Sequence, residues 1–209
     1  MKITIIIFQS ILLTLFIFNC NLIEGLDTSD DANITVTEFD IQNEFDSGHL
    51  EIPMENGTKI ISSVEELKQF TERNPQHSYL VEKMTQLAKF RKYCEINNIT
   101  EENYAEKDLA ILSDSSNEQQ TRATGWITVY EHTHQNGRIV AMIQHPQPFL
   151  RKKNRNKASS LKFNLPLSSA MLCDKSWFRG TKVGVQNLDG KTRLNLTDIG
   201  FNDRMESYY

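Results

Sequence analysis

The sequence predicts an α+β protein, in which a helical N-terminal segment is followed by a C-terminal β-sandwich. Over residues 60–120, apolar residues recur at the three- and four-residue intervals of an amphipathic helix. Over residues 124–209 they form short β-branched and aromatic runs between turn residues, which is typical of strands. Because the same order of motifs occurs twice in this second part, two similar β units are expected.

The first 25 residues have the pattern of a secretory signal peptide. An almost unbroken apolar run from Ile3 to Phe18 follows Lys2, and it is short for a membrane span. We predict cleavage after Gly25, with a cut at Cys20 and an uncleaved anchor as alternatives. No later segment is apolar enough to cross a bilayer, so the mature protein is expected to be secreted and extracellular.

Secretion would permit both a disulfide and N-linked glycans. Removal of the leader leaves Cys94 and Cys173, an even number that suits an oxidising compartment. One disulfide and two buried thiols are the alternatives, because a bridge requires Cα atoms within about 7 Å. Four Asn-x-Ser/Thr sequons predict glycans at Asn33, Asn56, Asn98 and Asn195.

Charge is divided unevenly along the chain. The formal net charge is −4, yet residues 26–123 hold 9 basic against 20 acidic residues, and residues 124–209 hold 13 against 6. This asymmetry predicts either that the two parts attract each other or that the basic part meets an anionic partner.

Residues 26–59 are acidic and polar with little periodicity, so we expect a leader without fixed structure, or a strand that begins near Ile34. Ser63 and Glu66 form a capping-box pattern that begins a helix, which ends at Asn74-Pro75. Apolar spacing predicts a second helix over residues 76–96. A third, short helix is expected from Thr100, and residues 113–120 form a polar linker to the next domain.

The β region begins with two strands, residues 126–130 and 138–143. Asn136-Gly137 lies between them and supplies residues that tolerate positive φ, which predicts a hairpin. A repeat then becomes visible, since the segment 130–137 lies 43 positions before 173–180, and 155–160 lies 47 before 202–207. Units this small are expected to share one core.

Each copy resembles the Greek key motif of the βγ-crystallins. The resemblance rests on an opening aromatic such as Tyr130, a glycine in a folded hairpin, Gly137 or Gly180, and a closing strand that carries Ser160 or Ser207. Gln135 stands where an aromatic is usual, and Cys173 replaces the first aromatic of the second copy. The resemblance covers residues 124–209 and implies a Greek key β-sandwich.

The resemblance also implies calcium sites that each draw on both motifs. Oxygen donors of this kind suit a hard cation. Arg155 occupies the first acidic or amide position of one motif and is expected to weaken binding, while Glu206 replaces a hydroxyl in the other. Calcium binding and retention of the turns for structure alone are both open. The implied ligands are Asn156, Ser159, Asn202, Asp203 and Glu206.

A dense basic run lies within the first motif. It predicts binding of an anionic glycan, a membrane surface or an acidic protein surface, this protein's own acidic part included, or else a solvated loop. Nucleic acid is not an expected partner, because stacking aromatics are not interleaved with the charges. The oligomeric state is not specified. The run comprises Arg151, Lys152, Lys153, Arg155 and Lys157.

Catalysis is not expected. Neither cysteine has a neighbouring catalytic motif, and His132 and His134 lack a further metal ligand. The resemblance implies a structural, stress or defence role. The alternatives are a protease inhibitor, which would use residues 144–149 as its reactive loop, and a toxin or antimicrobial component that acts through the basic β-domain.

Overall fold

The strands of the computed structural model form two sheets, one of five strands and one of four. The structure describes residues 34–105, 126–165, 168–187 and 193–209. The five-stranded sheet has the order β2-β1-β7-β6-β9, and the four-stranded sheet has the order β4-β3-β5-β8. The strands are β1 (Leu50–Met54), β2 (Gly57–Ile61), β3 (Ile127–Tyr130), β4 (Ile139–Ile143), β5 (Ser160–Phe163), β6 (Ser169–Lys175), β7 (Arg179–Gln186), β8 (Arg193–Asn195) and β9 (Ser207–Tyr208).

Two interlocked Greek keys build the sandwich, which confirms the predicted pair of β units. In the first unit, β3, β4 and β5 lie in the four-stranded sheet, while Gln147 crosses over and bridges Tyr208 of the other sheet. In the second unit, β6, β7 and β9 lie in the five-stranded sheet, while β8 crosses over and pairs with β5. Each unit therefore gives its third strand to the other unit's sheet, so neither can bury its core alone.

The predicted hairpin between the first two strands is confirmed, but its turn differs from the prediction. β3 and β4 pair antiparallel. Gly137 has the expected positive φ of 77°, whereas Asn136 has a φ of −94° and the left-handed residues beside it are His134 and Gln135. The turn is longer than an Asn-Gly turn because residues 133–135 form a short 3-10 segment.

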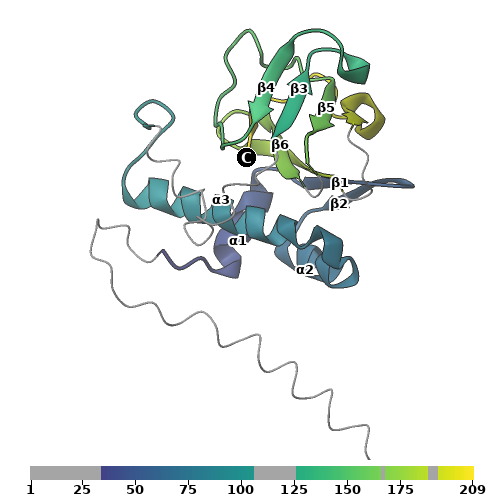
Figure 1. Cartoon of the computed structure of the whole chain (residues 1–209). Helices are drawn as coiled ribbons and strands as arrows, with labels where there is room; N and C mark the ends of the chain where they lie inside the picture. The colour runs from purple at the N-terminus through teal and green to yellow at the C-terminus, as the bar shows by residue number, and fades with distance from the viewer. Residues whose placement is uncertain (1–33, 106–125, 166–167, 188–192) are drawn as a thin grey trace, which may run out of the picture. The chain divides into compact units, whose positions relative to one another are not determined.

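Three helices cover the outer face of the five-stranded sheet, as Figure 1 shows: α1 (Glu38–Asp46), α2 (Val64–Arg73) and α3 (Tyr79–Ile96). Along β6, Ala170 and Leu172 point into the sandwich, while Met171 and Cys173 pack against the helices. Successive side chains of a strand point to opposite faces, so this sheet is buried on both sides.

The close approach of α3 to the sheet depends on a glycine in β7. A Cβ atom on Gly184 would lie 2.5 Å from Cδ2 of Leu80, which belongs to α3. A side chain there would force the side chains of Leu80 and Tyr79 to shift. None of the described helices is long and apolar enough to cross a membrane.

The helix predicted from Ser63 is confirmed with its cap. The Ser63 hydroxyl accepts a hydrogen bond from the Glu66 amide at 3.2 Å, while the Glu66 carboxylate accepts one from Ser62 rather than from Ser63. The second predicted helix is also confirmed, although residues 75–77 form a 3-10 turn before α3 begins at Tyr79.

The predicted leader of residues 26–59 is wrong over the part that the structure describes. Instead of an unstructured segment or a strand that begins near Ile34, residues 34–59 contain α1 and, after it, most of a β-hairpin. The hairpin exists because β1 adds to the sheet parallel to β7, with Leu50 opposite Lys182. Such pairing is a long-range interaction, and local periodicity carries no signal for it.

Two further predictions are corrected, and the cysteines follow one of their two alternatives. Residues 101–103 form a turn rather than the start of a third helix, and residues 106–111 lie outside the described residues. Cys94 and Cys173 are both buried and are not joined by a disulfide in the described structure, which is the second of the two alternatives for this pair. The helical and β segments, predicted as separate domains, belong to one compact unit because they share a core over the five-stranded sheet.

Candidate functional site

The predicted calcium ligands lie at the junction of the two Greek keys, in two equivalent places. The amide of Asn156 donates to the carbonyl of Met205 at 3.0 Å, and the amide of Asp203 donates to the carbonyl of Ala158 at 2.9 Å. Asn156 and Asp203 both have a φ of 53°. The repeat in the sequence is therefore a repeat in backbone geometry, with one turn from each motif facing the other.

The first place combines Asp203 with Ser159 of the other motif. The Ser159 hydroxyl donates to Oδ1 of Asp203 at 3.3 Å, and the Asn202 amide donates to Oδ2 of Asp203 at 2.8 Å. Oδ1 of Asn202 is buried and has no hydrogen-bond partner among the described residues. A buried amide oxygen without a donor is costly, and a cation would satisfy it.

The second place combines Asn156 with Glu206, whose carboxylate accepts hydrogen bonds on both oxygens, as that of Asp203 does, but no buried oxygen of these two residues lacks a partner. Oε1 of Glu206 accepts from the Asn156 side chain at 3.2 Å. Oε2 accepts from both the amide and the hydroxyl of Ser176, at 3.1 and 3.0 Å. The glutamate that replaces a hydroxyl here thus joins the two motifs directly.

Arg155 does not project toward these carboxylates. Its Nε donates to the carbonyl of Leu150 at 2.9 Å, and its guanidinium lies 5.9 Å from the centre of the Phe149 ring. Arg155, which departs from the calcium-binding pattern, therefore has a structural role: it fastens the basic run to the segment that precedes it.

The residues present fit calcium at one place only. Ser159, Asn202 and Asp203 offer three oxygen-bearing side chains, whereas calcium takes six to eight oxygen ligands. Backbone carbonyls and water would have to complete the shell, which is consistent with weak binding. The described residues contain no group of three or more His, Cys, Asp and Glu side chains that could hold a metal.

The two serines of the repeat fasten the folded hairpins, as predicted. Ser160 donates to the carbonyl of His132 at 2.6 Å and accepts from the amide of Gln135 at 2.9 Å. Ser207 donates to the carbonyl of Lys175 at 2.7 Å and accepts from the amide of Phe178 at 3.1 Å. Each hydroxyl both donates to and accepts from a backbone group, so neither serine is free to act on a ligand.

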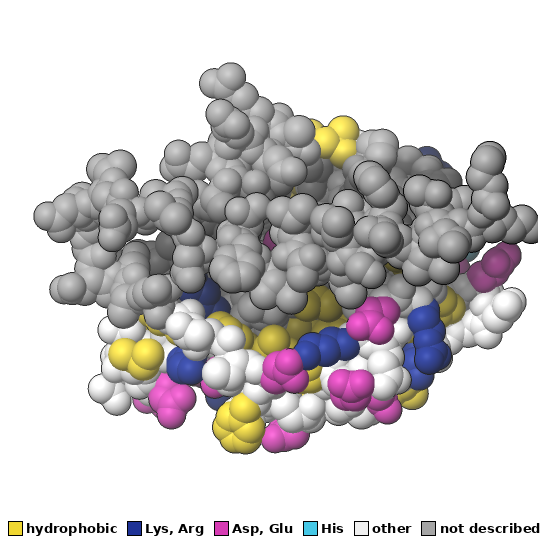
Figure 2. Space-filling model, turned by 90° about the horizontal axis from the view of Figure 1, so that it is seen from below, with side chains coloured by type: hydrophobic (Ala, Val, Ile, Leu, Met, Phe, Trp, Pro, Cys, Tyr) yellow, Lys and Arg dark blue, Asp and Glu magenta, His cyan; other side chains and the backbone are white. Residues whose placement is uncertain are grey.

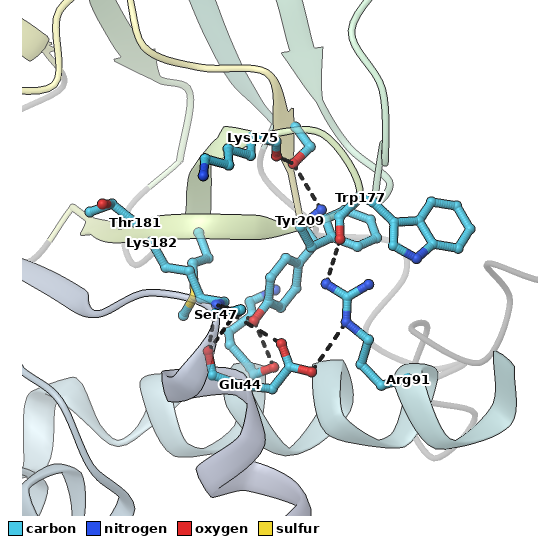
Figure 3. Close-up of polar contacts among 12 residues, drawn as sticks. Glu44, Ser47, Arg91, Lys175, Trp177, Thr181, Lys182 and Tyr209 are labelled. Atoms are coloured by element: carbon cyan, nitrogen blue, oxygen red, sulfur yellow. Dashed lines mark hydrogen bonds and ion pairs between the residues drawn. The ribbon is translucent and has the colours of Figure 1, made fainter. Parts of the chain in front are cut away.

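A second polar cluster, drawn in Figure 3, lies between the helices and the five-stranded sheet and was not predicted. The Lys182 side chain is only 1% exposed. Its Nζ donates to the carbonyl of Glu44 at 2.8 Å and to the hydroxyl of Ser47 at 3.3 Å, and it lies 3.9 Å from Oε2 of Glu44. Glu44 is in the last turn of α1, where the helix dipole favours a cation.

Burial shifts the pKa values of Lys182 and of Cys173 in opposite directions. Burial lowers the pKa of Lys182, while the nearby Cys173 and Glu44 oppose that shift. Cys173 lies opposite Lys182 in the β6–β7 pair, and burial raises its pKa to about 12. Its thiol therefore stays protonated near neutral pH, which is the state of an inert structural cysteine.

Arg91 of α3 completes the cluster. Its Nε donates to Oε1 of Glu44 at 3.2 Å, and its Nη2 donates to the carbonyl of Trp177 (Figure 3). Arg91 thus donates to one oxygen of the Glu44 carboxylate, while Lys182 lies 3.9 Å from the other, which has no hydrogen-bond partner among the described residues. Because Arg91 belongs to α3, Glu44 to α1 and Lys182 to β7, the cluster ties two helices to the sheet.

The acidic and basic parts of the chain do attract each other. Besides Glu44 and Lys182, Glu101 pairs with Arg179 at 2.6 Å and Glu51 pairs with Arg204 at 4.0 Å. The basic run takes no part in this attraction, because none of its side chains forms an ion pair with a described residue. One of the two alternatives for the charge asymmetry is thus confirmed, and the run remains available to another partner.

Beside the cluster, a hollow of about 400 Å³ opens between α1, α3 and Trp177. Three of its cations are already paired, Arg91 with Glu44, Lys92 with Asp40 and Arg179 with Glu101. The hollow therefore offers a ligand little unsatisfied charge.

Two interlocked Greek keys packed as a sandwich give the C-terminal region a βγ-crystallin-like fold. No protein-family model and no curated protein sequence matches the chain. Among solved structures, a βγ-crystallin from an archaeon is similar, with 16% identity, a TM-score of 0.35, and coverage of 41% of this chain and 95% of that one. A structure described under the evolution of the eye lens βγ-crystallin domain fold has 19% identity, a TM-score of 0.35, and coverage of 41% and 84%. This likeness concerns the fold alone.

We predict that Lys182 stabilises the protein far more than an exposed lysine does. Lys182→Met leaves the Glu44 carboxylate partly unpaired inside the protein, so the free energy of unfolding in urea should fall by about 3 kcal/mol. Adding Glu44→Gln should restore part of that loss, since the buried side chain that lost Lys182 is then neutral, and the partly exposed Arg91 can still donate to the amide oxygen.

The matched control is Lys92→Met, because Lys92 is 34% exposed and pairs with Asp40 on the helical side. That variant should change the free energy of unfolding by no more than about 1 kcal/mol. Equal losses for the Lys182 and Lys92 variants would contradict the role assigned to the cluster.

Proposed function

We propose that the chain is a secreted, non-enzymatic structural protein of βγ-crystallin-like fold, with one weak calcium site at the junction of its two motifs. The observation that carries this proposal is the pairing of Ser159 with Asp203 across the motifs at 3.3 Å, beside the unpartnered buried oxygen of Asn202. A cation there would join two turns that are far apart in the sequence. Calcium would then stabilise the sandwich rather than take part in a reaction.

The state of the nucleophilic side chains supports a non-catalytic role. The pKa of Cys173 is raised to about 12 by burial, and the hydroxyls of Ser160 and Ser207 are engaged with backbone groups. An activated nucleophile would need a lowered pKa or an adjacent base instead.

The position of two sequons supports secretion. Asn56 lies exposed in the turn between β1 and β2, and Asn98 lies exposed just after α3. Asn195 is half-buried on β8, where its Oδ1 accepts from the amide of His134 at 2.9 Å. Asn33 and the leader lie outside the described residues.

The alternative of a protease inhibitor is weakened by the position of its candidate loop. Backbone groups of Gln147 exchange hydrogen bonds with Tyr208 at 2.8 and 3.1 Å, and the carbonyl of Pro148 accepts from the amide of Trp177. A single bridge at Gln147 thus fastens residues 144–149 to the five-stranded sheet. A reactive loop has to stand clear of the scaffold, which this segment does not.

Calcium should raise the melting temperature of the mature protein reversibly. For a dissociation constant of about 1 mM, about 10 mM calcium stabilises the fold by about 1.4 kcal/mol, which corresponds to a rise in Tm of roughly 3 to 6 °C. Thermal unfolding followed by circular dichroism, with calcium and then with EDTA, measures this shift.

Two substitutions separate the two places at the motif junction. Asp203→Asn keeps a residue that tolerates positive φ but removes the only carboxylate of the first place, so the calcium shift should disappear. Glu206→Gln changes the charge of the second place by the same amount and should leave the shift intact. An unmoved melting curve of the wild type, or equal loss in both variants, would count against the proposed site.

Secretion predicts glycans on the exposed sequons. When the protein is expressed through a secretory pathway and deglycosylated enzymatically, mass spectrometry should find Asn56 and Asn98 converted to aspartate. Asn195 should be modified less because its side chain is half-buried. Secreted protein with both Asn56 and Asn98 unmodified would contradict this prediction.

A further inference from the structure

We propose that the outer face of the four-stranded sheet, together with the loop of residues 151–157, is a docking surface for anionic lipid membranes. We call the two together the basic face. The proposal goes beyond the structural role above, because it assigns a partner to the side of the sandwich that none of the described helices covers.

The outer face of this sheet is identified by the strand alternation. Ile127, Val129, Leu161 and Phe163 point into the sandwich core, so their neighbours Thr128 and Lys162 point outward. A row of side chains then crosses the sheet in register, from Met142 through Thr128 and Lys162 to Arg193. Thr128 is buried within this row, where its hydroxyl accepts a hydrogen bond from Asn164, so the accessible members are Met142, Lys162 and Arg193. Lys162 and Arg193 form no ion pair with a described residue, so this face is cationic.

Large apolar side chains are exposed on the same sheet. Met142 is 47% exposed and Ile139 is 51% exposed, both on the edge strand β4, and Trp126 at the start of β3 is 42% exposed. Tyr130 pairs with Ile139, and Thr128 pairs with Met142, which places both β4 residues on the outward side. Apolar side chains beside cations are the composition that inserts into the boundary between headgroups and acyl chains.

The basic loop lies against this edge strand in a fixed position. The Asn154 side chain donates to the carbonyl of Val140 at 2.6 Å, and Nη2 of Arg138 donates to the carbonyl of Lys153 at 2.6 Å. Val140 belongs to β4, and Arg138 immediately precedes that strand. The loop therefore lies beside the strand that carries Ile139 and Met142. Its exposed cations are Arg151, Lys152, Lys153 and Lys157.

Charge distinguishes this face from the helical side of the molecule. Figure 2 views the helical side, where Lys and Arg alternate with Asp and Glu over the described residues. On the basic face, seven cations form no ion pair with a described residue, while Arg138 is neutralised by Glu131 at 3.0 Å. A sulfated glycan would be held by the cations alone, and the exposed Ile139 and Met142 favour a lipid surface instead.

Binding of the mature protein to vesicles tests the proposal. Co-sedimentation should be seen with phosphatidylcholine vesicles that contain about 30% phosphatidylserine and not with phosphatidylcholine alone, and it should weaken with salt. Each basic residue at the surface is worth about fivefold in the partition coefficient, so Lys152→Gln/Lys153→Gln should lower it about 25-fold.

Two further variants make the result specific. Ile139→Ser/Met142→Ser should lower the partition coefficient although the net charge is unchanged. Lys59→Gln/Lys68→Gln, which changes the net charge as much as the loop variant but lies on β2 and α2, should leave binding within about twofold, because distant charges are screened. All substituted side chains are at least partly exposed, and their melting curves should match the wild type.

Three results would overturn the proposal. Equal binding to neutral vesicles would show that charge is not recognised. Equal loss in the Lys59/Lys68 variant would show that net charge rather than this face matters. Retention on immobilised heparin without binding to any vesicle would identify a sulfated glycan as the partner instead.

Discussion

The structure depends on the five-stranded sheet being buried on both faces. One face closes the core of the sandwich and the other carries the helices, so β6 and β7 need side chains suited to two apolar surroundings. Gly184 lets α3 approach, and Lys182 reaches across to the end of α1. A charged residue is stable in this layer because a helix end, a carboxylate and a hydroxyl surround its ammonium group.

In this arrangement one face of the sandwich packs against the helices, and other parts of its surface remain accessible for binding. The helices occupy one face and draw on the acidic part of the chain, since Glu44, Glu51 and Glu101 all pair with basic residues of the β region. The motif junction and the outer face of the four-stranded sheet remain uncovered by described residues. The proposed calcium site and the basic face lie on these uncovered parts, and they use different residues.

The sequence predicted correctly those features of the fold that depend on interactions within one element or one motif. The Ser63 cap, the apolar spacing of α3 and the repeat of Ser160 and Ser207 each depend on residues within one element or one motif. The repeat also brought together Ser159 with Asp203 and Asn156 with Glu206. The β1–β2 hairpin and the Lys182 cluster were missed because both arise from contacts between distant segments. A lysine between the β-branched residues Thr181 and Val183 was a signal for the cluster that local pattern analysis did not use.

Native-state hydrogen exchange of the mature protein tests most directly whether the helices and the sandwich fold as one unit. If the shared sheet governs stability, the slowest amides of α3 and those of β6 and β7 should exchange with the same free energy of opening and respond equally to urea. Exchange of the α3 amides at a free energy several kcal/mol lower, with β6 and β7 still protected, would show that the helices are a separable attachment and would contradict this account.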